Sequence, residues 1–469
     1  MKKTKIICTM GPACTDHDTL TKMVEAGMNV ARFNFSHGSH EEHQRNIQLV
    51  KQIREELDQP IALMLDTKGP EFRIGTFGEK QVELVAGETF TLTAEPVVGD
   101  VHQVSVSCPA IFQQLKAGDP ILINDGLVTI QVTERNDTRA VCKVIIGGIS
   151  NNKSMSFPNK LLHTEYLSQQ DKEDLLFGIH MNVDYVAASF VSTAQDMQDL
   201  RTFLDQNGGQ EIDIIAKIEN RSGVDNVEDI CSACGGIMIA RGDLGVEIPY
   251  VEVPSVQKKL TRMCRMLGKR VITATEMLES MTSKPRPTRA EISDVANAVY
   301  DGSSAIMLSG ETAAGQYPVE AVQAMSRIAV RTEADIDYEK RFRNTDFHLY
   351  HYNDAMSHGA CALAIDTKVS AIVVCTLSGD MARQVSRFRC PKPIIGMTTK
   401  RKVWNQLSLF WNVRPAMSEQ FPTVDVLLYH ARKVAKKSGL VKIGDRIIIT
   451  AGITNGTSGN TDLIKMEEI

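Results

Sequence analysis

The sequence lacks long hydrophobic runs and an excess of positive charge, and it has few closely spaced cysteine pairs. No uninterrupted apolar run approaches the ~18 residues of a membrane-spanning helix, so we expect no membrane contact. The 52 Lys and Arg residues are outnumbered by 57 Asp and Glu residues, which argues against broad affinity for nucleic acid. Ten cysteines spread over 469 residues do not form a disulfide framework, and we expect a cytoplasmic protein with reduced thiols.

Short apolar segments recur along two parts of the chain, and helical patterns separate them. Their cores are apolar at consecutive positions, which is typical of strands covered on both faces in a parallel sheet. Helices are predicted over residues 20–26, 41–57 and 290–300, and Thr288 and Glu291 have the spacing of a capping box. The eight predicted strands are residues 5–8, 29–34, 61–66, 184–189, 213–218, 236–240, 270–274 and 305–309.

Eight strand–helix units predict a (β/α)₈ TIM barrel, which typically takes ~250 residues. That length fits residues 1–69 together with 168–343, if residues 70–167 are an insertion. The insertion has short alternating segments such as VELVAG and VTIQVTE, so we expect a small β-barrel or sandwich that acts as a lid.

The last part of the chain, residues 344–469, has a pattern of its own. Predicted strands at 371–376, 394–398 and 446–451 alternate with helices at 354–366 and 424–437, which indicates an open α/β sheet.

Catalytic groups of such barrels lie at the carboxyl ends of the strands. Glu219 and Asp243 follow neighbouring strands, and two carboxylates suit Mg²⁺, which completes its shell with substrate oxygens and water. Lys217 and Arg32 would then clamp a phosphoryl group. The oxygens of Asn34, Ser36 and Thr67 suit a weakly hydrated monovalent cation. The polar residues at these strand ends are Arg32, Asn34, Ser36, Asp66, Thr67, Lys217, Glu219, Arg241, Asp243, Thr275, Ser309 and Glu311.

Six longer motifs resemble one known family. They are NVARFNFSHG (29–38), LDTKGPEFR (65–73), IAKIEN (215–220), GIMIARGDLGVEIP (236–249), KPRPTRAE (284–291) and IMLSGETAA (306–314). In this order they resemble pyruvate kinase of the bacterial three-domain type without an extra C-terminal domain. The resemblance implies transfer of the phosphoryl group of phosphoenolpyruvate to ADP, giving pyruvate and ATP, by a homotetramer.

The resemblance also implies a role for each matching residue. Arg32 and Lys217 contact the phosphoryl group, Glu219 and Asp243 hold Mg²⁺, and amides near Gly242 and Asp243 receive the substrate carboxylate. Thr275 lies where the enolate is protonated. Asn34, Ser36, Asp66 and Thr67 are expected to bind K⁺, and Asn34, His37, Arg73 and Lys153 to contact the nucleotide.

Three positions bear on the details. In the family, a glutamate at the position of Glu71 accompanies dependence on K⁺, so K⁺ activation is expected. Glu276 stands where the family usually has glutamine. Asp380, in the loop 376–381, replaces a cation of the family's sugar-phosphate site, so weak or absent activation by fructose 1,6-bisphosphate is expected.

Two alternatives stay open at this point. A Mg²⁺-dependent lyase or carboxylase relative would handle enolpyruvate without phosphorylating ADP, but the inserted domain together with Lys217, Arg73 and His37 favours a nucleotide. A catalytically silent binding subunit would have lost Lys217, Glu219, Asp243 or Thr275, and all four are present.

Overall fold

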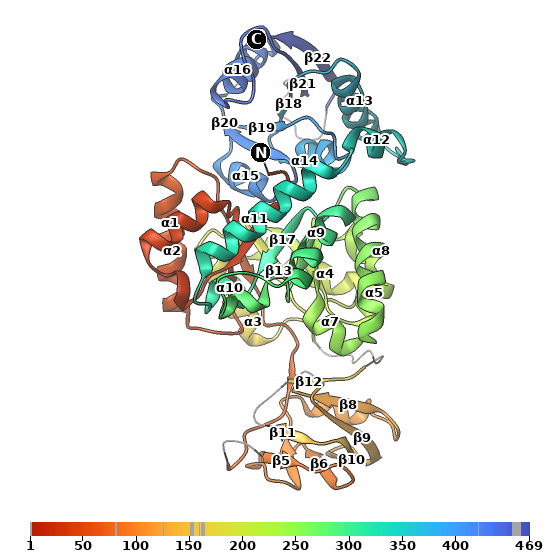
Figure 1. The fold of residues 1–469 in the computed structure, drawn as a ribbon. Coiled ribbons are helices and arrows are strands. Elements are labelled where there is room, and N and C mark those ends of the chain that lie inside the picture. The colour runs from red at the N-terminus through yellow and green to blue at the C-terminus, as the bar shows by residue number, and fades with distance from the viewer. Residues whose placement is uncertain are drawn as a thin grey trace.

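The computed structural model describes residues 2–79, 82–124, 126–150, 154–158, 160, 165–420, 422–452 and 461–469. The chain forms a central barrel, with the inserted β-rich segment at one end and the C-terminal α/β segment at the other (Figure 1). Within these ranges, no helix combines the length and apolar character that a membrane crossing requires.

The barrel is closed by eight parallel strands in the order β1-β17-β16-β15-β14-β13-β3-β2, so the predicted fold class is confirmed. Nearly every strand residue is buried, as the consecutive apolar positions predicted. The strands are β1 (Lys5–Thr9), β2 (Val30–Asn34), β3 (Ala62–Asp66), β13 (Tyr185–Ala188), β14 (Asp213–Ile218), β15 (Gly236–Ala240), β16 (Arg270–Ala274) and β17 (Ala305–Leu308).

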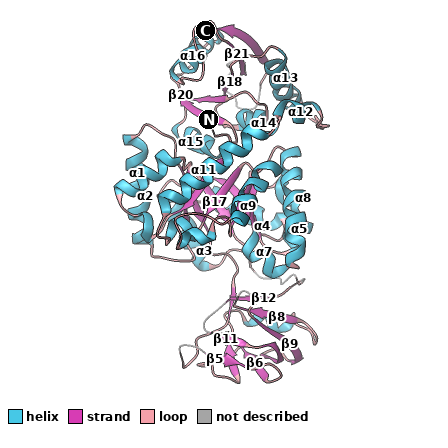
Figure 2. Cartoon of the chain, viewed as in Figure 1, coloured by secondary structure: helices cyan, strands magenta, loops and turns pink. Residues whose placement is uncertain are grey.

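Helices surround these strands (Figure 2). The predicted capping box of Thr288 and Glu291 is present at the start of its helix, which satisfies two backbone N–H groups of the first turn. The helices are α1 (His17–Ala26), α2 (His40–Glu56), α3 (Gln169–His180), α4 (Ala194–Gln206), α5 (Arg221–Asp225), α6 (Val227–Ser232), α7 (Arg241–Glu247), α8 (Val253–Met266), α9 (Arg289–Asp301), α10 (Gly310–Ala313) and α11 (Pro318–Asp335). The next helix, α12 (Tyr338–Arg343), lies beside the C-terminal segment (Figure 1), where Phe342 stacks on His358.

The insertion leaves the barrel after β3 and forms a seven-stranded and a two-stranded sheet around one apolar core. Short, mostly antiparallel strands are what its alternating segments predicted. The domain limits 70–167 stay a prediction. The strands are β4 (Phe72–Arg73), β5 (Val82–Leu84), β6 (Thr89–Thr93), β7 (Gln103–Ser105), β8 (Pro120–Ile123), β9 (Val128–Arg135), β10 (Arg139–Ile146), β11 (Gly148–Ser150) and β12 (Ser154–Ser156).

The C-terminal segment contains a five-stranded sheet in the order β20-β19-β18-β21-β22, in which only β22 is antiparallel to its neighbour. It packs against the amino ends of the barrel strands, where the Lys5 ammonium donates to the carbonyl of Val413. Its elements are α13 (Tyr352–Asp366), β18 (Ala371–Cys375), α14 (Asp380–Arg387), β19 (Ile394–Thr398), α15 (Arg401–Gln406), β20 (Val413–Met417), α16 (Val424–Lys437), β21 (Arg446–Ala451) and β22 (Leu463–Glu468).

Candidate active site

Lys217 lies near the carboxyl end of β14, where the barrel lumen opens toward the inserted segment. Its ammonium is 3.1 Å from Asp66 Oδ1 and 3.0 Å from Glu219 Oε1, and it donates to Ser189 Oγ at 2.7 Å. Burial works to lower the pKa of Lys217, but the two carboxylates outweigh it and raise the pKa above its usual range. The lysine is therefore a fixed cation in a buried site, not one partner of a surface ion pair.

Glu219 is fully buried beside this lysine. Its Oε2 accepts a hydrogen bond of 2.7 Å from the Phe190 amide, whereas its Oε1 has the ion pair with Lys217 but no hydrogen bond of good geometry. Burial raises the pKa of Glu219 to about 7, the ammonium of Lys217 lowers it, and the negative charge of Asp243 raises it. Because burial and the charge of Asp243 disfavour its ionised form, the Glu219 carboxylate would be stabilised by a further positive partner.

Arg32 ends on the same rim from β2. Its Nε donates to Asp66 Oδ2 at 2.6 Å and its Nη1 donates to Thr9 Oγ1 at 2.9 Å, so the guanidinium is held at two points. Burial alone would raise the pKa of Asp66, but Arg32 and Lys217 hold it below its usual range. Asp66 thus orients two cations, Arg32 and Lys217, at the same rim.

The start of α7 contributes backbone amides to the rim. The N-cap residue, Ala240, makes no side-chain hydrogen bond to this helix, and Asp243 lies in its first turn. Gly242 N donates to Thr275 Oγ1 at 2.8 Å, and this hydroxyl donates to Ala274 O at 2.6 Å. The expected carboxylate-binding amide and the expected proton source are therefore direct neighbours.

The backbone after β16 is strained. Thr275 and Glu276 have φ values of 66° and 54°, in the left-handed region that L-residues rarely adopt. Arg241 supports this turn, because its guanidinium donates to both carbonyls, at 2.7 and 3.0 Å, and is ion-paired with Asp294. Glu276 itself is exposed, and no ion pair is found for it within the described ranges.

The residues expected to bind a monovalent cation lie at the carboxyl ends of the neighbouring strands β2 and β3 and just beyond them. Asn34 pairs in register with Asp66, and its Oδ1 accepts from the Ser36 amide at 3.2 Å. Thr67 Oγ1 accepts from the Ser189 amide at 3.1 Å. The structure brings these oxygens to one part of the rim.

The residues expected to contact the nucleotide are partly placed. His37 is exposed just beyond β2, and Arg73 in β4 is ion-paired with Glu71 at 2.8 Å. Lys153 lies outside the described residues. Of the other strand-end residues, buried Glu311 has a structural role, because it accepts from the Leu278 amide and the Ser309 amide and so joins the loops after β16 and β17.

Sequence reasoning missed three groups that hold the charged side chains in place. Ser189 Oγ bonds Lys217, Thr9 Oγ1 bonds Arg32, and the Phe190 amide bonds Glu219. Ser189 was the last residue of a predicted strand, so its position at a strand's carboxyl end was a usable signal.

The donor set fits a divalent cation that also binds substrate. No group of three or more His, Cys, Asp or Glu side chains suited to a metal is found in the described part of the chain. Glu219 and Asp243 are a pair, and Mg²⁺ usually takes one or two carboxylates plus oxygens of substrate and water. The buried Glu219 Oε1, which lacks a hydrogen bond, is the observation that supports this fit.

These features define a TIM-barrel enzyme whose carboxyl rim is built for an anionic substrate. Comparison with known proteins narrows the class. A family model described as "Pyruvate kinase, barrel domain" matches residues 1–322, and one described as "Pyruvate kinase, alpha/beta domain" matches residues 354–467.

Individual relatives agree with the family models. The chain is 42% identical to a pyruvate kinase of Clostridium acetobutylicum over the full length of both, and 43% identical to that of Geobacillus stearothermophilus, of which it covers 80%. A crystal structure of a pyruvate kinase from Cryptosporidium parvum superimposes with a TM-score of 0.94 at 37% identity, covering 100% of this chain and 96% of that one. The chain belongs to the pyruvate kinase family and is a phosphotransferase.

Proposed function

We propose that Lys217, Arg32 and a divalent cation held by Glu219 and Asp243 carry out the reaction of the family at this rim. That reaction moves the phosphoryl group of phosphoenolpyruvate to ADP and gives pyruvate and ATP. The observation that carries the proposal is the buried ammonium of Lys217, fixed within 3.1 Å of two carboxylates at the barrel's carboxyl end.

The chain's own groups would bind and orient the substrate. Arg32, held by Asp66 and Thr9, would position the substrate phosphate, and the amides at the start of α7 would receive its carboxylate. Lys217 would neutralise the oxygens of the phosphoryl group as it moves. The divalent cation, Mg²⁺ in this proposal, would add positive charge for the phosphoryl oxygens and the enolate oxygen.

Thr275 would supply the proton that converts the enolate of pyruvate to the ketone. Departure of the phosphoryl group leaves an enolate, and its conversion to the ketone requires a proton on one face. The Thr275 hydroxyl, positioned by Gly242 N and Ala274 O, would deliver it directly or through a water relay.

We propose K⁺ as the monovalent cation, bound by oxygens of Asn34, Ser36, Asp66 and Thr67. Asn34, His37, Arg73 and Lys153 would contact the nucleotide. Glu71 pairs with Arg73, so the carboxylate associated with K⁺ dependence in the family lies beside an expected nucleotide contact.

We propose that fructose 1,6-bisphosphate activates weakly or not at all. Asp380 lies in the first turn of α14, where its own carboxylate favours the positive end of the helix dipole. Arg383 pairs with it at 3.2 Å, so the nearest cation of this helix is already engaged. The second hydroxyl-rich loop, 456–461, lies outside the described residues except for Thr461.

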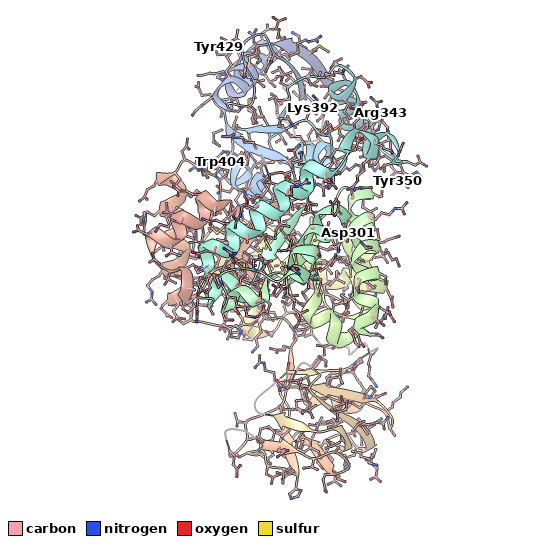
Figure 3. All side chains as sticks on the ribbon, viewed as in Figure 1. Asp301, Arg343, Tyr350, Lys392, Trp404 and Tyr429 are labelled. Carbon is pink, nitrogen blue, oxygen red and sulfur yellow. The ribbon has the colours of Figure 1, made fainter. Side chains whose placement is uncertain are left out.

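We propose a homotetramer in the cytoplasm. Apolar side chains are exposed on two separate parts of the chain: Tyr250 and Val251 precede α8 of the barrel, and Tyr350, Tyr429 and Ile443 belong to the C-terminal segment. Figure 3 shows Tyr350 and Tyr429 near the edges of the molecule. Two apolar regions suit the two kinds of interface of a dihedral tetramer.

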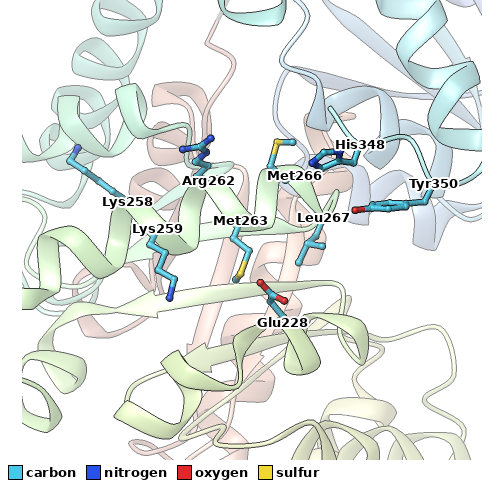
Figure 4. Close-up of a pocket in the computed structure, with 9 residues that line it drawn as sticks. All are labelled: Glu228, Lys258, Lys259, Arg262, Met263, Met266, Leu267, His348 and Tyr350. Atoms are coloured by element: carbon cyan, nitrogen blue, oxygen red, sulfur yellow. The ribbon is translucent and has the colours of Figure 1, made fainter. Parts of the chain in front are cut away.

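A cavity of about 640 Å³ lies between α8 of the barrel and residues 348–350 of the C-terminal segment. Figure 4 shows Met263 of α8, Leu267 just after this helix and Tyr350 among the residues that line the cavity. The lining combines apolar side chains, from Met263, Met266, Leu267 and Tyr350, with charged ones, and the apolar part supports an interface at the barrel side. The cytoplasmic location is supported by ten free thiols, nine of them buried.

The experiment is an assay of purified protein with phosphoenolpyruvate, ADP and Mg²⁺, with and without K⁺. We expect pyruvate and ATP in equal amounts, and a higher rate with K⁺ than with Na⁺. Pyruvate without ATP would favour the lyase alternative, and no turnover would favour a silent subunit.

A further inference from the structure

A second, small cavity lies where the amino ends of the barrel strands meet the C-terminal segment. Its volume of about 10 Å³ is enough for one water molecule or one monatomic ion. Six of the ten residues that line it are cationic: Arg265, Lys269, Arg270, Arg383, Arg387 and Arg389.

Among the residues that the structure describes, three of these cations have a carboxylate partner. Arg270 pairs with Asp213, Arg383 with the exposed Asp380, and Arg387 with Asp354 at 3.4 Å. In the part of the chain that the structure describes, no ion pair is found for Arg265, Lys269 or Arg389. The cavity therefore has an excess of positive charge in a poorly solvated place.

Within the described ranges, several N–H groups of these side chains have no hydrogen-bond acceptor. Arg389 is 5% exposed and its Nε is buried without a hydrogen bond, as are the Nε atoms of Arg387, 7% exposed, and Arg265. Arg389 cannot easily turn away, because its Nη2 donates to Gly302 O at 2.8 Å and its guanidinium stacks on Trp411. Buried donors without acceptors are costly unless a ligand pairs with them.

The pKa values of the unpaired cations agree with this picture. Burial, followed by the charge of Arg265, lowers the pKa of Arg389 to about 9. Burial likewise lowers the pKa values of Arg265 and Lys269, and neighbouring cations add to the effect. For the two guanidinium groups, which stay protonated in proteins, the lowered pKa values express the unfavourable energy of buried charges beside other cations.

We propose that this cavity binds one small monovalent anion, chloride in ordinary salt solutions. The ion would join Arg265 of α8 in the barrel to Arg387 and Arg389 of the C-terminal segment, and so would stabilise the junction between them. A volume of about 10 Å³ leaves no room for sulfate, phosphate or a nucleotide. The site is remote from the carboxyl rim, so the proposal does not depend on the catalytic assignment.

Crystals grown in sodium bromide test the site directly, because bromide replaces chloride and scatters anomalously. We expect an anomalous peak between Arg265, Arg387 and Arg389. An anomalous map that is empty at this position would overturn the proposal.

Thermal unfolding tests the effect in solution. We compare the unfolding midpoint in sodium chloride and in sodium gluconate at equal ionic strength, since gluconate is too large for the cavity. With chloride at about ten times its Kd, the unfolding equilibrium constant should fall about tenfold.

Two variants on one helix complete this test. Arg265→Gln should lose the difference between the two salts, and Arg262→Gln, an exposed arginine one turn away on α8, should keep it. Equal midpoints of the unaltered protein in both salts, or an unchanged difference in Arg265→Gln, would contradict the proposal.

Discussion

Replacement of Lys217 by methionine removes the ammonium and keeps most of the side-chain volume. At a separation of about 3 Å, like those from Lys217 to Asp66 and Glu219, two unit charges attract by about 5.5 kcal/mol at an effective dielectric of about 20. If the migrating phosphoryl group takes a similar position, loss of this attraction in the transition state lowers kcat by about 10⁴-fold. Binding of phosphoenolpyruvate, shared with Arg32 and the divalent cation, should change much less.

Lys402→Met is the matched control. Lys402 is also a nearly buried lysine, 3.5 Å from the carboxylate of Asp184, but it lies at the opposite end of the barrel. Both variants should lose stability, because each leaves a buried carboxylate without its ammonium. Steady-state assays of pyruvate formation, with thermal unfolding as a check of folding, distinguish them. A folded Lys217→Met protein with a kcat within tenfold of the unaltered enzyme would refute the reasoning.

Three further predictions concern other charged groups. Burial raises the pKa of Glu247 from 4.5 to about 7, so the folded state loses stability as pH rises through that window. Thermal unfolding measured between pH 4.5 and 7.5 should show this loss of stability. The loss should be smaller in Glu247→Gln. Glu71→Lys should give an enzyme whose rate in Na⁺ buffer approaches its rate in K⁺ buffer; a tenfold difference that persists would contradict the role of Glu71. Fructose 1,6-bisphosphate should change half-saturating phosphoenolpyruvate by less than about twofold, and Asp380→Lys should increase the response; a large effect on the unaltered protein would show that Asp380 does not block the site.

The barrel was predictable because its strands are buried on both faces. Segments such as 213–218 and 236–240 are apolar at consecutive positions, and the structure has strands β14 and β15 at the same residues. Predicted strands 184–189 and 305–309 end one residue early, at Ala188 and Leu308, because the chain turns there to place polar groups on the rim.

Two strands of the C-terminal sheet were missed for a related reason. Both β20 and β22 lie at the edges of the sheet. Edge strands tolerate proline and polar residues, so Pro415 in β20 and the polar residues of β22 hid them from a search for apolar runs.

The charged members of the candidate site could be found from strand ends, whereas their supports could not. That Ser189 and the Phe190 amide hold Lys217 and Glu219 depends on contacts between strands distant in the sequence. The left-handed backbone of Thr275 and Glu276 depends on Arg241, which comes from the preceding strand–helix unit. Only the folded chain shows these contacts.

The central claim is that Glu219 and Asp243 hold the divalent cation. Its most direct test is to count the Mn²⁺ ions, used in place of Mg²⁺, that bind to each chain. The measurement is made with phosphoenolpyruvate present and without nucleotide. Electron paramagnetic resonance measures this number from the loss of the free-ion signal. We predict one tightly bound ion in the unaltered protein and in the control Glu228→Gln, an exposed carboxylate on α6, and none in the Glu219→Gln, Asp243→Asn double variant. Tight binding of one ion by the folded double variant would contradict the account.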